Sequence, residues 1–238
     1  MNKNYVFHQA DHRGGSDIGW LKSKFSFSFA NYYNPEMMGF GTLRVINDDI
    51  VAGWQGFGEH SHSNMEIVSI PTAGAVLHKD SMGNDKVIKA WEVQVMSAGS
   101  WVVHSEMNHS VSEDAKFFQI WIQTREDNIE PSYSQKAFNH EDRRDIFQLL
   151  INPEGWDNLV KIHQDAYISR GNLSSWKTLD YTKYDSKNGI YIYIISGNIK
   201  IWDYDLSHRD ALWISNVESI TIESQSRSDV LILEVPMS

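Results

Sequence analysis

The sequence predicts an all-β fold, and three features of the chain support this prediction. Short apolar segments alternate with polar residues at a period of two, as in half-buried strands. Clusters of Gly, Asn and Asp separate these segments, for example at 47–49 and 83–85. Helical periodicity is weak along the whole chain. Many short strands at this spacing are typical of a sandwich or a barrel.

The first half of the chain supplies the clearest strand signals. In 24–29 the alternation is strict, so Phe25, Phe27 and Phe29 should share one face. Further strands are expected, in order, at 42–46, 65–70, 75–78, 92–96, 101–104 and 117–122.

A polar, charged stretch at 125–145 contains Pro131 and is expected to be a linker or crossover. The next residues, 145–150, fit one helical turn or a strand. Strands then resume, and we expect them at 190–195, 199–203, 211–215, 219–222 and 230–235.

A faint internal repeat suggests that the two halves are related domains. Residues 67–80 and 191–203 both read as strand, Gly-containing turn and strand. When Gly74 is aligned with Gly197, Lys183 and Asp185 fall where His60 and His62 stand. We therefore expect an N-terminal domain at 1–130 and a C-terminal domain at 131–238, the second without the histidine pair.

Length and composition restrict the function classes. The 238 residues suffice for one large β domain or two small ones. The net charge of −10 argues against direct nucleic-acid binding, and the longest apolar run, 190–195, is too short to span a membrane. The absence of cysteine excludes disulfides and thiolate metal sites, and the N-terminus has no signal-peptide pattern. We expect a cytoplasmic monomer without a membrane partner.

Two pairs of residues carry the functional signal. His60 and His62 are spaced i, i+2, as are His104 and Glu106. In a strand this spacing points both side chains to one face. Three imidazoles and one carboxylate suit a borderline divalent metal such as Fe(II), Mn, Ni or Zn, and four protein ligands leave open positions on a six-coordinate ion.

A single H-x-H pair is most often structural, but two such strands that flank a hairpin favour a metal. The pattern H-x-H-x3-E in His60, His62 and Glu66, with His104 about thirty residues beyond the turn, resembles the two motifs of the cupin superfamily of small β-barrels. The remaining histidines lack comparable pairing and are expected to be structural or on the surface: His8, His12, His78, His109, His140, His163 and His208.

The resemblance extends further, to the pirin family, over about residues 10–125. It is carried by GWLKSKFSFSFANYYNPEMMGFGTLRVINDD, HSHSNMEIV, HKDSMGN, VQVMSAG, VVHSEMN and FFQIWI. Pirins are bicupins, so the resemblance implies two cupin, jelly-roll type β-barrels packed face to face with a metal in the first only. It also implies that the metal ligands are His60, His62, His104 and Glu106, whereas Glu66 is not a ligand. His78, in HKDS, matches a pirin position near the first barrel.

The chain departs from the usual pirin pattern at several positions. Ser61 and Ser63 replace the usual Pro and Arg, and 89–91 (Lys-Ala-Trp) replace a Pro-Gly turn. Trp101 stands where smaller residues are common, so it is expected either to narrow the pocket or to line it. Phe40, Met65, Phe117 and Trp121 are further candidates for its walls.

The resemblance implies two functions from different classes. One is quercetin 2,3-dioxygenase activity, in which a flavonol ring is opened with O2 and Glu106 acts as the catalytic proton acceptor. Its partner would be a small aromatic, flavonol-like substrate, and its cofactor one divalent transition metal, Fe(II) first, with Mn, Ni, Co, Cu or Zn as alternatives. The other is a metal- or redox-sensing protein that binds a transcription factor or metabolic enzyme as its regulatory partner. A third reading is a metal-binding cupin with another natural substrate and incidental flavonol turnover.

Overall fold

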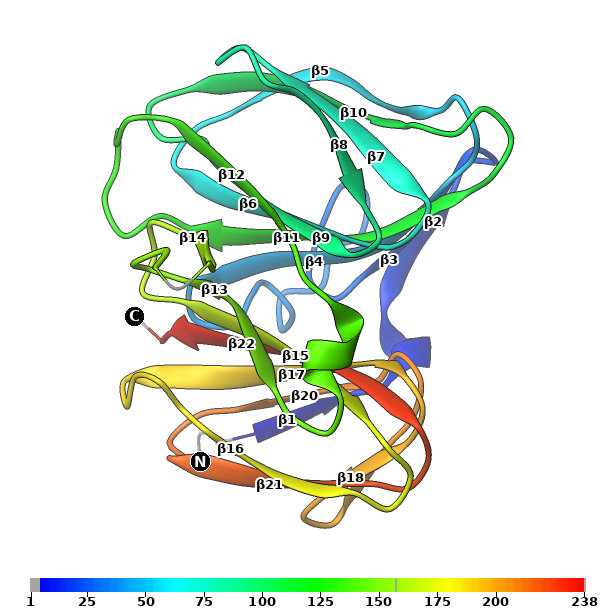
Figure 1. Cartoon of the computed structure of the whole chain (residues 1–238), viewed down its shortest axis with the longest axis vertical. Helices are drawn as coiled ribbons and strands as arrows, with labels where there is room; N and C mark the ends of the chain where they lie inside the picture. The colour runs from blue at the N-terminus through cyan, green and yellow to red at the C-terminus, as the bar shows by residue number, and fades with distance from the viewer. Residues whose placement is uncertain (1–4, 157, 238) are drawn as a thin grey trace.

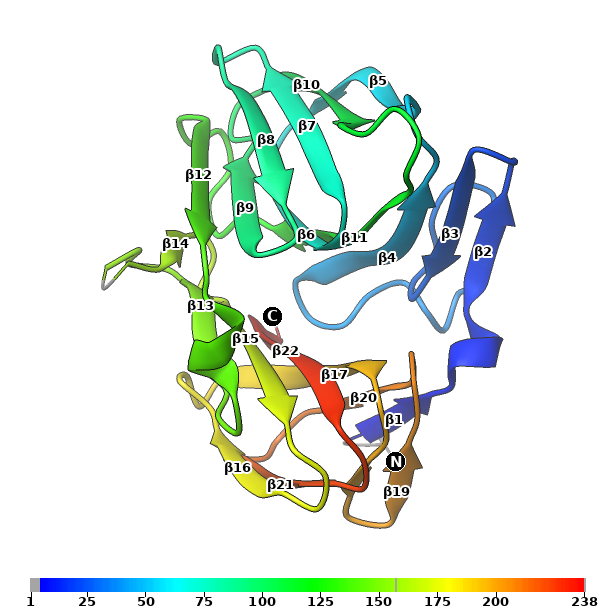
Figure 2. The same cartoon turned by 45° about the vertical axis from the view of Figure 1, so that its right-hand side comes forward.

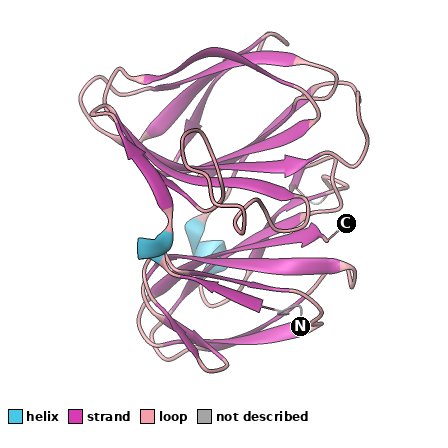
Figure 3. Cartoon of the chain, turned by 180° about the vertical axis from the view of Figure 1, so that it is seen from behind, coloured by secondary structure: helices cyan, strands magenta, loops and turns pink. Residues whose placement is uncertain are grey.

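The computed structural model describes residues 5–156 and 158–237, and most of them lie in β-strands (Figures 1 and 3). Within these ranges the helical segments are two single 3-10 turns, η1 (Ala10–His12) and η2 (His140–Arg143). The all-β prediction is therefore confirmed. None of the helices described is long or apolar enough to cross a membrane. The strands form two barrels stacked on each other, each made of one seven-stranded and one four-stranded sheet.

The first barrel is the upper one in Figure 1. Its seven-stranded sheet has the order β12 (Ser132–Ala137), β9 (Glu92–Ser97), β6 (Met65–Ala73), β11 (Ala115–Gln123), β4 (Leu43–Val51), β3 (Leu21–Phe25) and β2 (Gly14–Asp17). Its four-stranded sheet has the order β5 (Gly56–His62), β10 (Val102–Asn108), β7 (Ala75–Asp80) and β8 (Asp85–Lys89).

The second barrel repeats this plan. Its seven-stranded sheet has the order β1 (Tyr5–His8), β20 (Ala211–Ile214), β17 (Asn188–Ser196), β22 (Ser228–Pro236), β15 (Tyr167–Leu173), β13 (Gln148–Asn152) and β14 (Val160–Lys161). Its four-stranded sheet has the order β16 (Thr178–Thr182), β21 (Ser219–Ser224), β18 (Ile199–Ile201) and β19 (Tyr204–Leu206). Its interior is filled mainly by isoleucine and leucine side chains.

The two barrels exchange strands at their edges. β1, from the N-terminus, pairs with β20 of the second barrel, and β12 pairs with β9 of the first (Figure 2). Both exchanges cross the predicted domain division at residue 130, which itself stays a prediction. The internal repeat has a structural counterpart, because Gly74 and Gly197 end β6 and β17 in corresponding turns with φ of 70° and 87°.

The largest apolar cluster lies between the barrels, where the two seven-stranded sheets pack face to face. Val68 and Ile120 of the first sheet belong to the same buried cluster as Ile168 and Leu231 of the second. The indole of Trp213 is stacked against both Phe27 and Phe40, at ring-centroid distances of 5.8 and 5.7 Å. The candidate site residues lie on the opposite side of the first sheet, inside the first barrel.

Two sequence-based expectations are wrong in detail. β3 ends at Phe25, so the predicted shared face of three phenylalanines is broken: Phe27 enters the cluster between the barrels, whereas Phe25 and Phe29 contact each other at 5.3 Å and line a cavity of the first barrel. The expected linker at 125–145 contains β12 and η2, because the edge of β9 offers backbone groups with which the polar segment can pair.

Of the two alternatives for 145–150, the strand is confirmed as β13.

Candidate metal centre

Three adjacent strands of the four-stranded sheet, β5, β10 and β7, bring the predicted site residues together. His60 on β5 and His104 on β10 are direct cross-strand partners, and a register shift follows between His104 and Glu106. The ring centroids of His60, His62 and His104 are 4.4 to 5.0 Å apart. The i, i+2 spacing thus places both β5 histidines on the face toward His104.

The imidazole nitrogens of this triad are suited to bind a metal. His60 Nδ1 donates to Gly58 O at 2.8 Å, so Nε2 is the free acceptor of that ring. Among the described atoms, His62 Nε2 and both nitrogens of His104 are buried without a hydrogen-bond partner. Burial, with smaller contributions from neighbouring histidines, lowers the pKa of His62 to about 4 and that of His104 to about 2. Neutral imidazoles with unused lone pairs are the form that coordinates a metal.

Glu106 lies deeper in the same barrel and is 3% exposed. Its carboxylate accepts hydrogen bonds from Ser69 Oγ at 2.8 Å and from Gln119 Nε2. Burial raises the pKa of Glu106, and these two donors act in the opposite direction. Ser69 and Gln119 were not predicted as site residues; a lone polar side chain within each of the apolar runs IVSI and FFQI was the available signal.

The ligand atoms form two triads that share His104. In one, donor atoms of His60, His62 and His104 all lie within 4.8 Å of one another; in the other, those of His78, His104 and Glu106 do. Among the described residues, the four predicted ligands do not all lie in one such group: Glu106 groups with His104 and His78, not with His60 and His62.

His78 thus belongs to the site region. The sequence placed this residue only near the first barrel. It is fully buried, is the cross-strand partner of Glu106, and shares a 2.9 Å hydrogen bond between Nε2 and Asp80 Oδ2. Its Nδ1 has no partner among the described atoms.

Glu66, the carboxylate of the general cupin pattern, lies elsewhere. Its Oε2 accepts hydrogen bonds from Ser97 Oγ at 2.6 Å and from the backbone N–H of His163 in the second barrel at 3.2 Å. Glu66 therefore joins the two barrels and is not part of either histidine triad.

A cavity of about 430 Å³ opens beside His60 and Glu106. Its aromatic wall residues are Phe25, Phe29, Phe57 and Trp121. The indole of Trp121 packs edge-on to the His62 ring at 4.8 Å. Of the other three wall candidates, Phe40, Met65 and Phe117, none lines this cavity.

Trp101 was expected to narrow or line the pocket, and that expectation is wrong. The side chain is 57% exposed and is absent from the cavity walls, because it lies in the turn before β10 rather than on an inward position of the strand.

The same cavity contains a buried acid that sequence reasoning missed. Asp49, on β4, is 2% exposed and lines the wall near Glu106. Burial, with the charges of Asp48 and Glu106, raises the pKa of Asp49 to about 7, although a hydrogen bond from Ser23 acts to lower it.

Two jelly-roll barrels face to face, with a histidine and glutamate cluster inside the first, define a bicupin. Comparison with known families agrees: the family model described as Pirin matches residues 6–122, and the one described as Quercetinase C-terminal cupin domain matches residues 149–235. The chain belongs to the pirin family.

Individual relatives match over nearly the whole chain. The quercetin 2,3-dioxygenase of Escherichia coli (strain K12) is 40% identical over 96% of this chain and 97% of its own. A pirin-like protein of Caulobacter vibrioides is 36% identical over 94% and 96%. The crystal structure of the bacterial pirin YhhW from Escherichia coli in complex with nickel(II) superposes with a TM-score of 0.92 at 38% identity, over 98% of this chain and all of that one.

Proposed function

We propose that this protein is a metal-dependent dioxygenase of the quercetin 2,3-dioxygenase type. The observation that carries the proposal is the position of His60 and the buried Glu106 carboxylate in the wall of an aromatic-lined cavity, beside the buried imidazoles of His62 and His104, which have unpartnered nitrogens. The names of the relatives support the same reaction class. We further propose a cytoplasmic location and a flavonol-like small molecule as the substrate.

The proposed metal ligands are His60, His62, His104 and Glu106. The donor set, three imidazoles and one carboxylate, fits a divalent transition metal, and we propose Fe(II) first, with Mn, Ni, Co, Cu or Zn as alternatives. The YhhW crystal structure is a complex with nickel(II), which supports the proposal that this chain binds a transition metal. When bound, the metal supplies Lewis acidity that lowers the pKa of a substrate hydroxyl.

The protein side chains then have two tasks. The rings of Phe25, Phe29, Phe57 and Trp121 hold the flat rings of the flavonol and keep water away from them. When its carboxylate is released from the metal, Glu106 is placed to accept the proton of the flavonol 3-hydroxyl. In the overall reaction both atoms of O2 enter the ring-opened depside and one ring carbon leaves as carbon monoxide.

The test is a simultaneous measurement of quercetin absorbance and dissolved oxygen with the metal-loaded protein. We expect one O2 to disappear for each quercetin lost, and we expect chelation to stop both. Glu106→Gln should lower kcat by about 10²- to 10⁴-fold, the usual contribution of a general base. Glu113→Gln, which changes an exposed glutamate of the next turn, is the matched control.

Other outcomes would overturn the proposal. Absorbance change without oxygen uptake means binding only, and turnover after complete metal removal refutes metal dependence. A metal-loaded protein with neither activity would instead support the alternative, a metal- or redox-sensing binding protein that regulates a transcription factor or a metabolic enzyme.

A further inference from the structure

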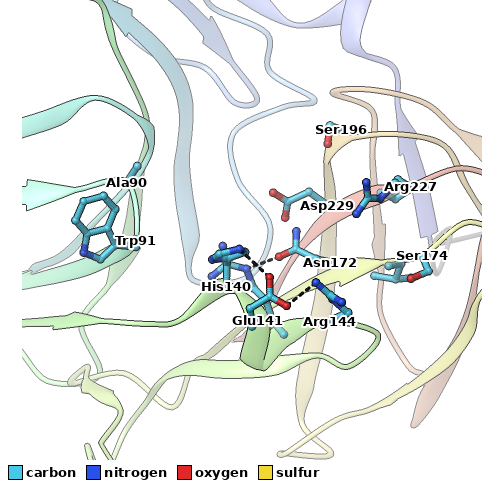
Figure 4. Close-up of a pocket in the computed structure, with 13 residues that line it drawn as sticks. Ala90, Trp91, His140, Glu141, Arg144, Asn172, Ser174, Ser196, Arg227 and Asp229 are labelled. Carbon is cyan, nitrogen blue, oxygen red and sulfur yellow. Dashed lines mark hydrogen bonds and ion pairs between the residues drawn. The ribbon is translucent and has the colours of Figure 1, made fainter.

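A second cavity, of about 580 Å³, lies away from the histidine cluster and is lined by residues of both barrels (Figure 4). The turn between β8 and β9 contributes Trp91 on one side. The second barrel contributes Ser174, Arg227 and Asp229 on the other, and η2 with Arg144 lies between them. The volume is in the range of small-molecule sites.

Two buried cations lie at this cavity. Arg143 is part of its wall, and Arg170 contacts the wall residue Asp229. Arg143 and Arg170 are each 7% exposed. Arg170 forms a two-pronged pair with Asp229, through Nε at 2.8 Å and a terminal nitrogen at 2.5 Å. Arg143 has no ion pair among the described residues; its Nε donates to the neutral amide oxygen of Asn172 at 2.6 Å. The Asp229 carboxylate is therefore taken up by Arg170, and Arg143 has no carboxylate partner among the described residues.

A buried unpaired charge is costly, and Arg143 remains charged at neutral pH. Burial, followed by repulsion from Arg170, lowers the pKa of Arg143 to about 10, and Asp229 only partly opposes this. The other acid in the wall, Glu141, is paired with Arg144 and bonded to His140. An anion from solution would supply the partner that Arg143 lacks.

The segment that carries Arg143 is held rigidly against the second barrel. Asn139 caps η2 by accepting from Glu141 N–H, and Asp145 N–H donates to Asn172 O at 2.8 Å. Asp145 Oδ1 in turn accepts from Ser174 N–H at 2.7 Å. The guanidinium is thus positioned before any ligand arrives, which lowers the entropic cost of binding.

The opposite wall offers an aromatic surface. The Trp91 side chain is 53% exposed, and Lys89 Nζ lies 5.5 Å from its ring centroid, which adds positive charge at this rim. A flat apolar group is the natural complement of this indole face.

We propose that this cavity binds a small organic anion, with its carboxylate or phosphate group on Arg143 and its flat apolar part against Trp91. This site is separate from the metal centre and does not depend on the dioxygenase proposal. The two anionic groups share the chemistry that a guanidinium recognises, so the probes must distinguish them.

The test is calorimetric titration of the metal-loaded full-length protein at low salt with inorganic phosphate, benzoate and phenyl phosphate. We expect saturable one-to-one binding, tighter for an aromatic probe than for inorganic phosphate; the tighter of benzoate and phenyl phosphate identifies the anionic group. Arg143→Gln should weaken binding by about tenfold or more. Arg125→Gln, a change of an exposed arginine outside the cavity, should have no effect. Trp91→Ala should weaken phenyl phosphate but not inorganic phosphate.

Two further measurements keep the result clear. Binding at this cavity should persist after metal removal, whereas a probe that binds at the metal centre would lose its affinity. If Arg143→Gln does not fold, Arg227→Gln at the exposed rim should still weaken binding, and the indole ¹⁵N–H resonance of Trp91 should shift on adding phenyl phosphate. No saturable binding below about 10 mM, unchanged affinity in Arg143→Gln or Arg227→Gln, or dependence on the metal would overturn the proposal.

Discussion

His60 and His104 face each other across the β5–β10 pair as direct register partners, with ring centroids 4.4 Å apart. Each is prepared for a ligand in a different way: His60 is held by a backbone carbonyl through Nδ1, whereas His104 is buried with both nitrogens unpartnered among the described atoms. In this pair, the ring of His60 is already oriented by a hydrogen bond, whereas the nitrogens of His104 would gain a partner only when a metal binds.

His104→Ala should abolish metal binding, because His104 is the residue that both triads share. We expect the affinity to fall by more than about 100-fold, since residues that merely support a ligand already contribute about 10- to 100-fold. Metal per protein is measured by mass spectrometry after dialysis. His109→Ala, which changes an exposed histidine just past β10, should keep the wild-type ratio. Equal metal content in both variants would remove His104 from the site.

Ser69→Ala should destabilise the metal-free protein, because the hydroxyl donates to the buried Glu106 carboxylate. Loss of a hydrogen bond to a charged group costs about 1.5–3 kcal/mol. The bond favours the ionised carboxylate, so the loss should be larger at pH 8.5 than at pH 5, where Glu106 holds a proton more often. Urea denaturation at both pH values measures it. Ser105→Ala, on the adjacent β10 position, is the control, and a pH-independent difference would contradict the assignment.

Trp121→Leu should weaken flavonol binding and leave metal content unchanged. The indole forms part of the cavity wall and contacts the His62 ring, so its removal costs stacking area without removing a ligand. We expect KM for quercetin to rise by about tenfold, which corresponds to one aromatic contact. Trp101→Gly should change neither KM nor metal content, because Trp101 lies outside this cavity. If Trp101→Gly raises the KM for quercetin and Trp121→Leu does not, the substrate binds near Trp101 and not in this cavity.

Asp49→Asn should stabilise the metal-free protein increasingly as pH rises. The pKa of Asp49 is about 7 in the folded state against 3.8 as the ordinary value, so the folded protein binds this proton more tightly. The resulting stabilisation of wild type is complete below about pH 4 and is lost as pH rises through about 7. The difference amounts to at most about 4 kcal/mol.

Urea denaturation of wild type and Asp49→Asn at pH 4.5, 6 and 8 measures this change. Asp127→Asn, at an exposed loop position, provides the comparison and should show no such trend. A stability difference that stays constant across the three pH values would mean that Asp49 is ionised throughout.

The parts of the site that the sequence predicts are those set by local spacing. Along β5 and β10 the i, i+2 rule alone places His60 with His62 and His104 with Glu106 on inward faces. Contacts that require closure of the barrel are different: Gln119 reaches Glu106 from the opposite sheet, and His78 reaches it by strand register. No local pattern contains that information.

The fold shows the same division between local and long-range information. Alternation and turn residues predict the strands, but not that β1 joins the sheet of the second barrel, because that pairing spans about the whole chain. The direction of Phe27 depended on where β3 ends. In the sequence, the alternation of apolar residues continues from Phe25 to Phe27. In the structure β3 ends at Phe25, Ser26 N–H donates to Ile46 O, and the chain then turns toward the other barrel.

Trp213→Ala should loosen the contact between the barrels. The indole stacks on Phe27 and Phe40, which belong to the first half of the chain, while Trp213 itself lies on β20 of the second barrel. Truncation of a fully buried large aromatic costs about 3–5 kcal/mol, and because Trp213 is partly buried we expect a loss toward the lower end of that range. Trp176→Ala, at a position that is 81% exposed, should stay within about 0.5 kcal/mol of wild type.

The same variant distinguishes global stability from the integrity of the metal centre. Trp213 packs on the outer face of the first sheet, whereas the histidine triad lies inside the barrel, so metal per folded protein should be unchanged. Urea denaturation monitored by circular dichroism gives the stability, and metal analysis of the folded fraction gives the second value. If Trp213→Ala loses metal in proportion to its loss of stability, the second barrel is required to hold the centre together. An unchanged metal ratio with a lowered unfolding free energy would mean that the first barrel builds the centre from its own strands.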